Sequence, residues 1–435
     1  MNRRDFLQKT SIASVSLVLP RIHTAAEQKI KIAIVGTGWF GSDLLLPNAL
    51  AGGKFEILAL CDVNQKAFQK SLDLLQKAGL PRPAIYSDYR KMYEMPGLEA
   101  VVISSPTHWH ALQFIDACKK GLHVFLEKPV CFDIAESKAM MTAHQKAGNV
   151  VVVDFERVQF GINEKIKAYI DSGEAGIIRQ VMVNLHSPEG SVIEKPVPDH
   201  LDFEAFCGPA PKQKFLCDPN SDIPNWRANA AFGHGTMVDW GSHYLHNARK
   251  VMGLGLPDWV MTTGGSLKNT GQEQPDYVDV HFKYGSLPVH YTQRNWGYQS
   301  PNPDTNIGVW YLGEKATVFS GEFGWEVYPE GGKPKINHGE IGFKPWTEEF
   351  NVKMNEGIKK QFIEWYNGIM AKSNKHISAP LSDAIQTNTA MIMADLAYRT
   401  GLGMITENNL ETDAAVSKLL KREYRKGYKH PYDNL

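Results

Sequence analysis

Short apolar runs alternate with amphipathic segments over the first third of the chain. The runs are rich in β-branched residues, which is typical of strands that are buried on both faces. The predicted strands span residues 29–35, 55–61, 100–104, 121–126 and 150–153, and the clearest helices between them span 111–120 and 134–147. Because strands that alternate with helices form parallel sheets, we predict an α/β domain with a doubly wound parallel sheet.

The pattern changes beyond residue 154. A helix (163–172) and a strand (177–186) precede a long polar, proline-rich stretch (187–230), which we expect to be a functional loop. The β-rich runs that follow are separated by Gly, Asn or Pro, as in an antiparallel sheet. These runs span residues 259–264, 276–284, 287–295, 308–312 and 316–320, and two long helices span 355–371 and 383–400. We therefore predict one domain over residues 27–153 and a second over 154–435.

Residues 1–26 differ in character from the rest of the chain. Arg3 and Arg4 precede a modest apolar stretch (11–19) and a small-residue end (24–26), which is the arrangement of an export signal peptide. The adjacent arginines resemble a twin-arginine signal, so we expect an exported, periplasmic protein; a basic, disordered tail is the alternative. The apolar stretch is too short to cross a bilayer.

Composition and charge argue against several classes of protein. The chain has 47 basic and 47 acidic residues; segment 1–26 holds four of the basic residues and one of the acidic ones, so the remainder carries 43 and 46. This balance gives no general attraction to nucleic acid or to an anionic membrane. The five cysteines include no CxxC pair, which argues against a zinc ribbon. Cys207 and Cys217 could bridge a loop, but buried free thiols are favoured.

A glycine-rich turn follows the first predicted strand. Residues 36–41 read Gly-Thr-Gly-Trp-Phe-Gly and fit the pattern GxGxxG between a strand and a helical segment, which indicates a dinucleotide site. Gly36 permits the tight turn, Gly38 lets the backbone approach a pyrophosphate, and Gly41 lets the helix pack closely on the strand. Asp62, at the end of the second strand, is spaced to bind an adenosine ribose, which favours NAD over NADP. Its alternative role is to cap the next helix.

Two further motifs, taken with the glycine turn, resemble the Gfo/Idh/MocA oxidoreductase family, which includes glucose-fructose oxidoreductase and inositol dehydrogenase. They are Thr-His-Trp-His-Ala at residues 107–111, in the loop after a predicted strand, and Glu-Lys-Pro at residues 127–129. The resemblance covers nearly the whole chain after residue 26. It implies a Rossmann domain followed by an α/β domain with a large open, mainly antiparallel sheet that often serves as an oligomer interface. It also implies that the 383–400 helix packs near the first domain.

The resemblance implies a set of site residues as well. Lys, Asp and His form a catalytic set in the family, and by position they are Lys128, Asp239 and His243. Lys128 would bind a substrate hydroxyl, and Asp239 would orient His243, four residues away on one helix face, as the base. The predicted cofactor contacts are Gly36, Thr37, Gly38, Trp39, Phe40, Gly41, Asp62, Ser104, Ser105, Thr107, His110, Glu127 and Lys128. The predicted substrate contacts are Lys128, Arg157, Asp239, His243 and His246.

His246 departs from the family pattern, which commonly has Asp at this position. We expect His246 to contact the sugar; a metal site formed by Asp239, His243 and His246 on one helical face is the alternative. Several aromatic residues of the second domain could also line a sugar site, although a core or interface role is favoured for them. These aromatic residues are Tyr291, Trp296, Trp310 and Trp325.

Together these features predict an exported NAD(P)-dependent oxidoreductase that acts on a carbohydrate or polyol hydroxyl by hydride transfer. Because free NAD is scarce outside the cytoplasm, we expect the cofactor to stay tightly bound. One alternative is an NAD-dependent glycosidase that uses transient oxidation and elimination, and another is a non-catalytic sugar- or cofactor-binding protein. The expected partner is a small-molecule carbohydrate, with no nucleic acid and no stable membrane insertion, and the expected assembly is a homo-oligomer, either a dimer or a tetramer. The charged, aromatic tail (418–435) either wraps a neighbouring subunit or lies on the surface.

Overall fold

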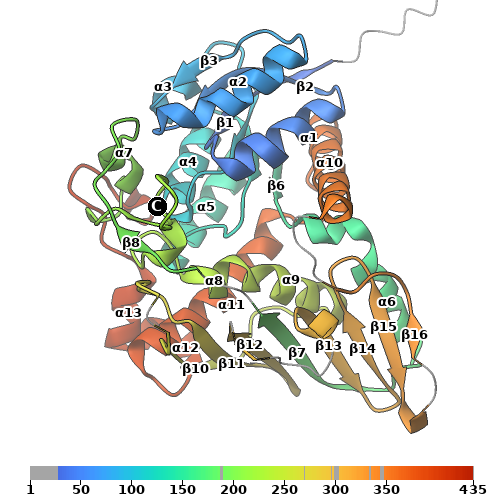
Figure 1. Cartoon of the computed structure of the whole chain (residues 1–435). Helices are drawn as coiled ribbons and strands as arrows, with labels where there is room; N and C mark the ends of the chain where they lie inside the picture. Colours follow the sequence, from blue (N-terminus) through green and yellow to red (C-terminus); the bar gives the residue numbers. More distant parts are fainter. Residues whose placement is uncertain are drawn as a thin grey trace, which may run out of the picture.

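The chain folds around two sheets, with a row of helices between them (Figure 1). The computed structural model describes residues 28–186, 190–268, 270–294, 296–297, 303–332, 335–342 and 347–434. The predicted export signal lies outside these residues. Within them, no helix combines the length and the apolar character that a membrane crossing requires.

The first domain is built on a parallel sheet of six strands in the order β3-β2-β1-β4-β5-β6, which confirms the predicted doubly wound sheet. The strands are β1 (Ile30–Val35), β2 (Phe55–Cys61), β3 (Ala84–Tyr86), β4 (Ala100–Ile103), β5 (His123–Leu126) and β6 (Val151–Val153). Ile32 and Ile34 of β1 belong to one core and Ala33 and Val35 to the other, which explains why the sequence of this strand is continuously apolar. The strand order reverses between β1 and β4, and ligands of such sheets bind at the carboxyl ends of the strands beside this point.

Helices cover both faces of this sheet. They are α1 (Leu46–Ala51), which follows a π-helical turn at Gly41–Leu45, α2 (Phe68–Lys77), α3 (Tyr89–Tyr93), α4 (Thr107–Lys119) and α5 (Ile134–Ala147). A further helix, α10 (Glu348–Ala371), returns from the far end of the chain and packs against α1. Its Phe362 ring stacks on Phe125 of β5, with the ring centroids 4.4 Å apart, and Trp365 is fully buried beside them. The core of the first domain therefore includes a helix from the predicted second range, and the boundary at 153/154 stays a prediction.

The second domain is built on a nine-stranded sheet in the order β16-β15-β14-β13-β7-β12-β11-β10-β17. The strands are β7 (Ile178–His186), β10 (Trp259–Gly265), β11 (Tyr277–Tyr284), β12 (Leu287–Arg294), β13 (Gly308–Gly313), β14 (Ala316–Ser320), β15 (Trp325–Pro329), β16 (Ile336–Asn337) and β17 (Ile405–Thr406). Strands β7 and β12 pair in parallel, and the other neighbouring pairs are antiparallel. The prediction of a large, mainly antiparallel sheet is therefore confirmed.

Four helices pack on the inner face of this sheet. They are α6 (Ile162–Asp171), α8 (Gly235–Asp239), α9 (Gly241–Met252) and α11 (Leu381–Thr400). Helix α11 also contacts α5 and β6, so it lies between the two domains (Figure 1). Tyr291 and Trp325 are buried in this core, in agreement with the core role that the sequence favoured for them.

The polar stretch before α8 is more than a loop. Its described residues (190–230) contain two short strands, β8 (Ile193–Glu194) and β9 (Leu216–Cys217), and a helix, α7 (Phe203–Cys207). Cys207 and Cys217 are both buried and free, as predicted. The bridging segment, residues 200–210, reaches the first domain: Leu201 forms a β-bridge with Asn64, and the Phe206 carbonyl accepts a hydrogen bond from Trp109 Nε1 at 3.0 Å. The last helices of the chain are α12 (Glu407–Thr412) and α13 (Ala414–Leu420).

Two predicted boundaries are wrong. The motif at 107–111 is the first turn of α4 rather than a loop, because the helix begins at Thr107 directly after the extended residue Pro106. Helix α10 begins at Glu348 instead of residue 355, where the Thr347 side chain caps it by accepting a hydrogen bond from the Phe350 N–H.

Candidate active site

The glycine turn leaves an open surface at the carboxyl end of β1. Gly36 has a φ of +89°, and a Cβ there would lie 2.6 Å from the backbone of Ser104. A Cβ on Gly41 would lie 2.1 Å from the Gly36 carbonyl oxygen, whereas a Cβ on Gly38 would meet nothing within 4 Å. Packing therefore requires glycine at 36 and 41, and the free space over Gly38 fits the pyrophosphate of a dinucleotide.

Asp62 fixes this turn from the neighbouring strand. Its Oδ2 accepts a hydrogen bond from the Thr37 backbone N–H at 2.7 Å, and its Oδ1 accepts one from the Asn64 N–H at 2.8 Å. The cap of the next helical turn is Asn64, whose side chain accepts from the Lys66 N–H. The helix cap is therefore Asn64 and not Asp62. The Asp62 carboxylate can still accept hydrogen bonds from ribose hydroxyls.

The predicted cofactor contacts differ in exposure. Trp39 and Phe40 pack edge to face at the rim of the turn, and Trp39 is 51% exposed. Glu127, in contrast, is buried beside Asp154. Burial raises the pKa of Glu127 well above its usual range and also raises the pKa of Asp154. The neighbouring charge of Asp154 adds to the rise at Glu127 and the charge of Lys128 opposes it, so burial and Asp154 together favour the protonated form of Glu127.

The remaining predicted cofactor contacts of the first domain follow the carboxyl end of β4, and one of them, Ser104, contacts the glycine turn. They are Ser104, Ser105, Thr107 and His110. Ser104 Oγ donates to the Gly36 carbonyl oxygen at 2.7 Å. The buried His110 ring lies between two carbonyl oxygens, 2.8 Å from that of Pro129 and 2.6 Å from that of Ser105. Burial lowers the pKa of His110 to about 4, and the neutral ring can donate to only one of these two carbonyl oxygens at a time.

Lys128 lies at the junction of the two domains. Its Nζ donates to Asp239 Oδ1 at 2.8 Å and to the Asp239 carbonyl oxygen at 3.0 Å. The other carboxylate oxygen of Asp239 accepts from Arg227 Nε at 2.5 Å. Burial alone would raise the pKa of Asp239, but the charges of Arg227 and Lys128 outweigh burial and lower that pKa to about 2. Asp239 is therefore an ionised bridge between two cations, and one Nζ hydrogen of Lys128 stays available for a ligand.

His243 is not oriented by Asp239, contrary to the prediction. Asp239 ends α8, His243 belongs to α9, and both carboxylate oxygens of Asp239 bind cations. The carboxylate beside His243 is Glu156, whose Oε2 lies 3.7 Å from His243 Nδ1; within the described part of the chain neither atom has a hydrogen-bond partner. His243 Nδ1 is completely buried while Nε2 is not, so Nε2 is the nitrogen that a ligand can reach. Burial lowers the pKa of His243 well below its usual range and keeps the imidazole neutral.

His246 lies beneath the site. It is fully buried, its ring stacks on Phe155 with the centroids 4.0 Å apart, and its Nδ1 is 2.9 Å from Thr387 Oγ1. The predicted sugar contact by His246 is incompatible with this position. The alternative metal site formed by Asp239, His243 and His246 is also wrong, because these three do not have metal-ligand geometry. Among the described residues, one group elsewhere in the chain does. That group is Asp133, Glu136 and His430.

Arg157 was predicted to bind substrate, but protein carboxylates occupy it. Its Nη1 donates to Glu156 Oε1 at 2.7 Å, and its Nη2 lies 2.7 Å from Glu322 Oε1. The side chain is only 7% exposed. Arg157 therefore holds Glu156 beside His243, and burial raises the pKa of Glu156 to about 7 against the opposing charge of Arg157.

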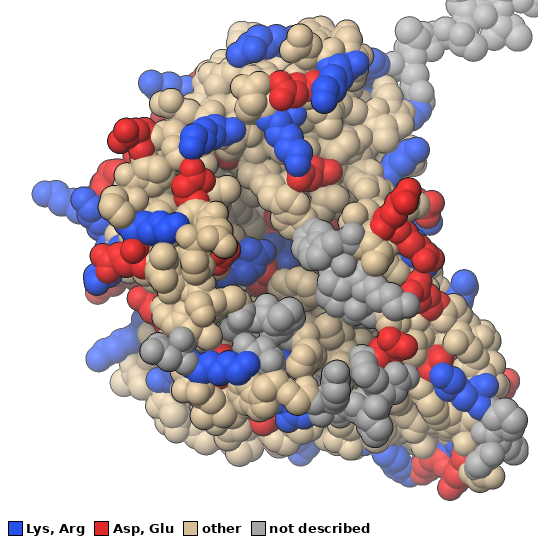
Figure 2. Space-filling model, in the orientation of Figure 1, with Lys and Arg blue, Asp and Glu red and all other residues tan. Residues whose placement is uncertain are grey.

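The site opens where the two domains meet. Figure 2 shows a hollow at this junction with basic side chains at its floor. Sequence reasoning missed Arg227, Asp154 and Glu156. The available signal for the two acids was their position directly after β6, whose carboxyl end lies at the same edge of the sheet as that of β1. Arg227 lies in the polar stretch, where only its contact with Asp239 reveals its role.

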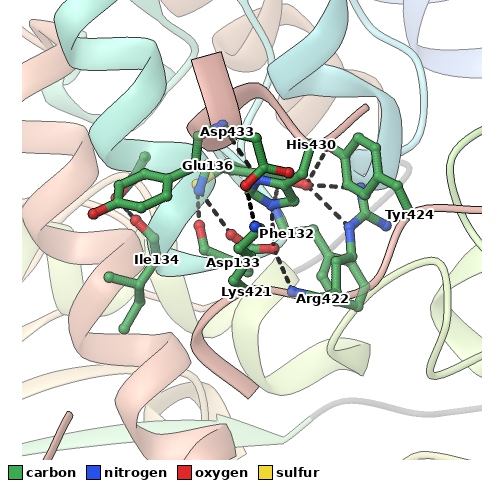
Figure 3. A network of polar contacts seen from close by, with 12 residues as sticks. Phe132, Asp133, Ile134, Glu136, Lys421, Arg422, Tyr424, His430 and Asp433 are labelled. Carbon is green, nitrogen blue, oxygen red and sulfur yellow. Dashed lines mark hydrogen bonds and ion pairs between the residues drawn. The ribbon is translucent and has the colours of Figure 1, made fainter. Parts of the chain in front are cut away.

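The C-terminal tail, residues 421–434, braces the segment that follows Lys128 (Figure 3). Asp133 caps α5 by accepting from the Glu136 N–H at 2.7 Å, and His430 Nε2 lies 3.0 Å from Asp133 Oδ2. Arg422 Nε and Nη2 donate to Glu136 Oε1 at 3.0 and 2.8 Å. Donors from the tail therefore occupy the Asp133 and Glu136 carboxylates. The ion pair with Arg422 explains why these acidic side chains lie close together. The tail packs on its own first domain.

A dinucleotide-binding domain is joined to a large mixed sheet, and a lysine, an aspartate and a histidine lie at the junction. This arrangement is typical of nicotinamide-dependent oxidoreductases. Residues 30–155 match the sequence model described as an oxidoreductase family with an NAD-binding Rossmann fold. Residues 30–155 therefore form a domain of this family, the Gfo/Idh/MocA oxidoreductases.

Curated relatives match parts of the chain. The uncharacterized oxidoreductase YrbE of Bacillus subtilis is 30% identical over 267 residues, which is 60% of this chain and 66% of YrbE. A glycosyl hydrolase family 109 protein of Stenotrophomonas maltophilia is 30% identical over 134 residues, which is 29% of each chain. The matched region thus spans under two thirds of the length of these relatives.

Solved structures share the whole fold. The aldose-aldose oxidoreductase of Caulobacter crescentus has a TM-score of 0.62 at 18% identity and covers 87% of this chain and 100% of its own. An inositol dehydrogenase homolog of Azotobacter vinelandii has a TM-score of 0.65 at 18% identity and covers 87% and 97%. At this identity the likeness concerns the fold alone.

Proposed function

We propose that this protein is an NAD(P)-dependent oxidoreductase that acts on a carbohydrate or polyol hydroxyl. The observation that carries the proposal is the buried Lys128–Asp239 pair, which joins the two domains and lies close enough to His243 for the charge of Lys128 to lower the pKa of that imidazole. Two proteins of the same fold support a polyol-like substrate: the Caulobacter enzyme was solved with glycerol, and the Azotobacter homolog with NADH and myo-inositol.

The side chains divide the work between orientation and proton transfer. The free Nζ hydrogen of Lys128 binds the reacting hydroxyl oxygen and stabilises the negative charge that develops on it. His243 Nε2 takes the proton of that hydroxyl, and Glu156, 3.7 Å from the opposite ring nitrogen, is the nearby carboxylate that would accept the proton of Nδ1. Bound NAD(P) supplies the acceptor for the hydride, held by the glycine turn and by Asp62, whose charge favours NAD.

We further propose that the cofactor stays bound between turnovers. The bridging segment contacts both the β2–α2 connection, where Gln65 N donates to the His200 carbonyl oxygen at 2.9 Å, and the start of α4. These two regions flank the adenosine end of a dinucleotide in this fold. Arg425 of the tail holds the segment from outside by pairing with Glu204 and donating to the Gly208 carbonyl oxygen at 3.0 Å.

The nucleotide content of protein purified without added cofactor tests these proposals. We expect mass spectrometry of the denatured protein to find NAD(H) in stoichiometric amount, and reduction of that NAD when sugar is added. Gly38→Val is the matched variant: its Cβ would meet no protein atom within 4 Å and its side chain takes the space expected for the pyrophosphate, so it should fold and emerge empty. A native protein that is empty and binds NAD only weakly contradicts retention, and one that binds neither NAD nor NADP contradicts the oxidoreductase.

NAD-dependent glycoside cleavage is the second candidate. It is favoured by relatives named glycosyl hydrolase family 109 proteins and by an alpha-N-acetylgalactosaminidase of Shewanella oneidensis, 26% identical over 155 residues. A panel of nitrophenyl glycosides separates the two functions. Release of nitrophenol without net NADH assigns the glycosidase, whereas stoichiometric NADH, or paired oxidation and reduction of two sugars, assigns the oxidoreductase.

The pH profile tests the role of Glu156. Ionised Glu156 accepts the Nδ1 proton of His243 and leaves Nε2 free as a base, whereas protonated Glu156 donates to Nδ1 and places a proton on Nε2. Since burial raises the pKa of Glu156 to about 7, kcat/KM for oxidation should rise as pH increases through about 7. Glu156→Gln should lose this step, and Glu164→Gln, an exposed control on α6, should keep it. An unchanged step in Glu156→Gln rules out this role.

We also propose that the protein is exported and assembles as a homo-oligomer. The twin-arginine-like segment supports export, and fractionation of cells that express the full chain tests it. The large sheet supports assembly because the half-buried rings of Trp310 and Tyr328 pack together over the buried Phe319 on the side away from its helices. Analytical ultracentrifugation should therefore find a dimer or a tetramer, and a strictly monomeric protein contradicts the proposal.

A further inference from the structure

One cation of the site is fixed in place but only partly used. Arg227 Nε donates to Asp239 Oδ2 at 2.5 Å, while the Arg227 side chain is 42% exposed. Within the described residues, its two Nη nitrogens donate no hydrogen bond. The end of the guanidinium group that faces away from Asp239 is therefore available to a ligand.

The orientation of this guanidinium group is set before any ligand arrives. Its carbon lies 4.4 Å from the centroid of the Trp226 ring, in a cation–π contact. The indole needs the space left by Gly233, where a Cβ would lie 2.8 Å from the ring. The Asn225 side chain caps this turn by accepting from the Ala228 N–H. A planar group held by Trp226 and Asp239 loses little freedom when it binds a planar anion.

The charges at the accessible side of the site do not balance. Asp239 is ionised and carries one negative charge against the two positive charges of Lys128 and Arg227. The carboxyl groups of Glu127 and Asp154 near Lys128 are buried, so they do not form part of this accessible side. The Lys128 side chain is 10% exposed and that of Arg227 is 42% exposed. The positive charge that an incoming substrate meets first is therefore that of Arg227.

We propose that Arg227 binds a carboxylate of the substrate, so that this site acts on an acidic sugar. Two Nη N–H groups in one plane match the two oxygens of a carboxylate. The inference rests on the proposed oxidoreductase function and names its substrate class. Because the single carboxylate of Asp239 spans Lys128 and Arg227, the hydroxyl on Lys128 and the carboxylate on Arg227 belong to neighbouring parts of the sugar.

Binding measurements test the inference without relying on turnover. The holoprotein, saturated with NAD, is titrated calorimetrically with matched pairs of aldose and uronate of gluco, galacto and manno configuration, and with the corresponding sugar 6-phosphates. The native protein should bind one uronate about 10- to 100-fold more tightly than its aldose. Arg227→Gln should bring that ratio close to one, and Arg227→Lys, which keeps the charge but loses the fork, should retain part of it. Arg179→Gln removes an exposed arginine that also pairs with one carboxylate, Glu314, and should leave the ratio unchanged.

The other outcomes overturn the inference. Equal binding of aldose and uronate shows that Arg227 does not select an acid, and tighter binding of a sugar phosphate assigns a different anion. If Arg227→Gln weakens both members of a pair equally, or weakens only NAD, the residue serves to position Asp239 or to bind the cofactor. If the protein turns over neutral sugars with NAD after such a result, the proposed oxidoreductase function stands and only the inference about Arg227 fails. If it binds neither NAD nor any sugar, both proposals fail.

Discussion

Lys128→Met is expected to lower sugar turnover by about a thousandfold without unfolding the protein. The variant loses the only cation that contacts Asp239 from the first domain, and with it the donor for the reacting oxygen. Removing one such donor, or one acid–base group, costs about two to four orders of magnitude in rate. Asp239 stays paired with Arg227, so its own charge is still compensated after the substitution. The measurement is single-turnover reduction of bound NAD by the sugar that the native protein uses.

Two controls make this result specific. NAD binding by Lys128→Met should stay within a few-fold of the native value, because the glycine turn and Asp62 are untouched. Lys167→Met, which removes an exposed lysine paired with Asp171, should leave turnover unchanged. A Lys128→Met protein that turns over sugar within tenfold of the native rate would sink the proposed mechanism, and a native protein that binds sugar and NAD without turnover would be the non-catalytic binding protein.

Arg422→Met is expected to be the most destabilising change of a single tail residue. Glu136 is completely buried, and its Oε1 accepts from Arg422 and from the Tyr424 hydroxyl at 2.7 Å (Figure 3). Removing one partner of a buried ion pair leaves the other charge uncompensated, at a cost of about 3 to 5 kcal/mol in the free energy of unfolding. Urea unfolding followed by tryptophan fluorescence measures this loss.

The pH dependence of the loss identifies its cause. Burial raises the pKa of Glu136, and Arg422 opposes that rise, so the variant should have a still higher folded-state pKa. A carboxyl whose folded pKa is raised loses stability as pH increases above its unfolded pKa, so the deficit should be larger at pH 8 than at pH 5. Lys421→Met is the matched control on the same tail, since the Lys421–Asp433 pair is exposed and should contribute little to stability. Equal stability of the two variants would show that the tail is only a surface segment.

The same network connects the tail to the chemistry. Arg422 Nη2 also donates to the His108 carbonyl oxygen at 2.6 Å, and its guanidinium group lies 4.2 Å from the centroid of the Phe132 ring. Phe132 follows Lys128 closely in the chain, and its carbonyl oxygen is 2.6 Å from His234 Nε2, just before α8. The segment that carries Lys128 is thus held from both sides, by the tail and by the second domain.

Local features of the sequence were sufficient for the nucleotide half of the molecule. A strand, a glycine turn and a helix lie within one short segment, so the need for Gly36 and Gly41 follows from that segment and its neighbour at Ser104. Asp62 was found by spacing for the same reason. The 107–111 motif was recognised but assigned to a loop, because a helix that starts directly after a proline leaves little periodicity to detect.

The pairing of charges was decided by the tertiary structure. Spacing on one helix predicted that Asp239 would orient His243, but the packing of the two domains brings Lys128 and Arg227 to Asp239 and Glu156 to His243. His246 was expected to face the sugar, yet the contact with Phe155 buries it. The sequence by itself determined the fold class and the dinucleotide turn, because these depend on patterns within short segments, whereas the catalytic role of Lys128 stays a prediction from the family resemblance. Which carboxylate serves which base, and which cation stays free for a substrate, depends on contacts between residues far apart in the chain and on the burial that shifts their pKa values, and only the folded structure specifies these.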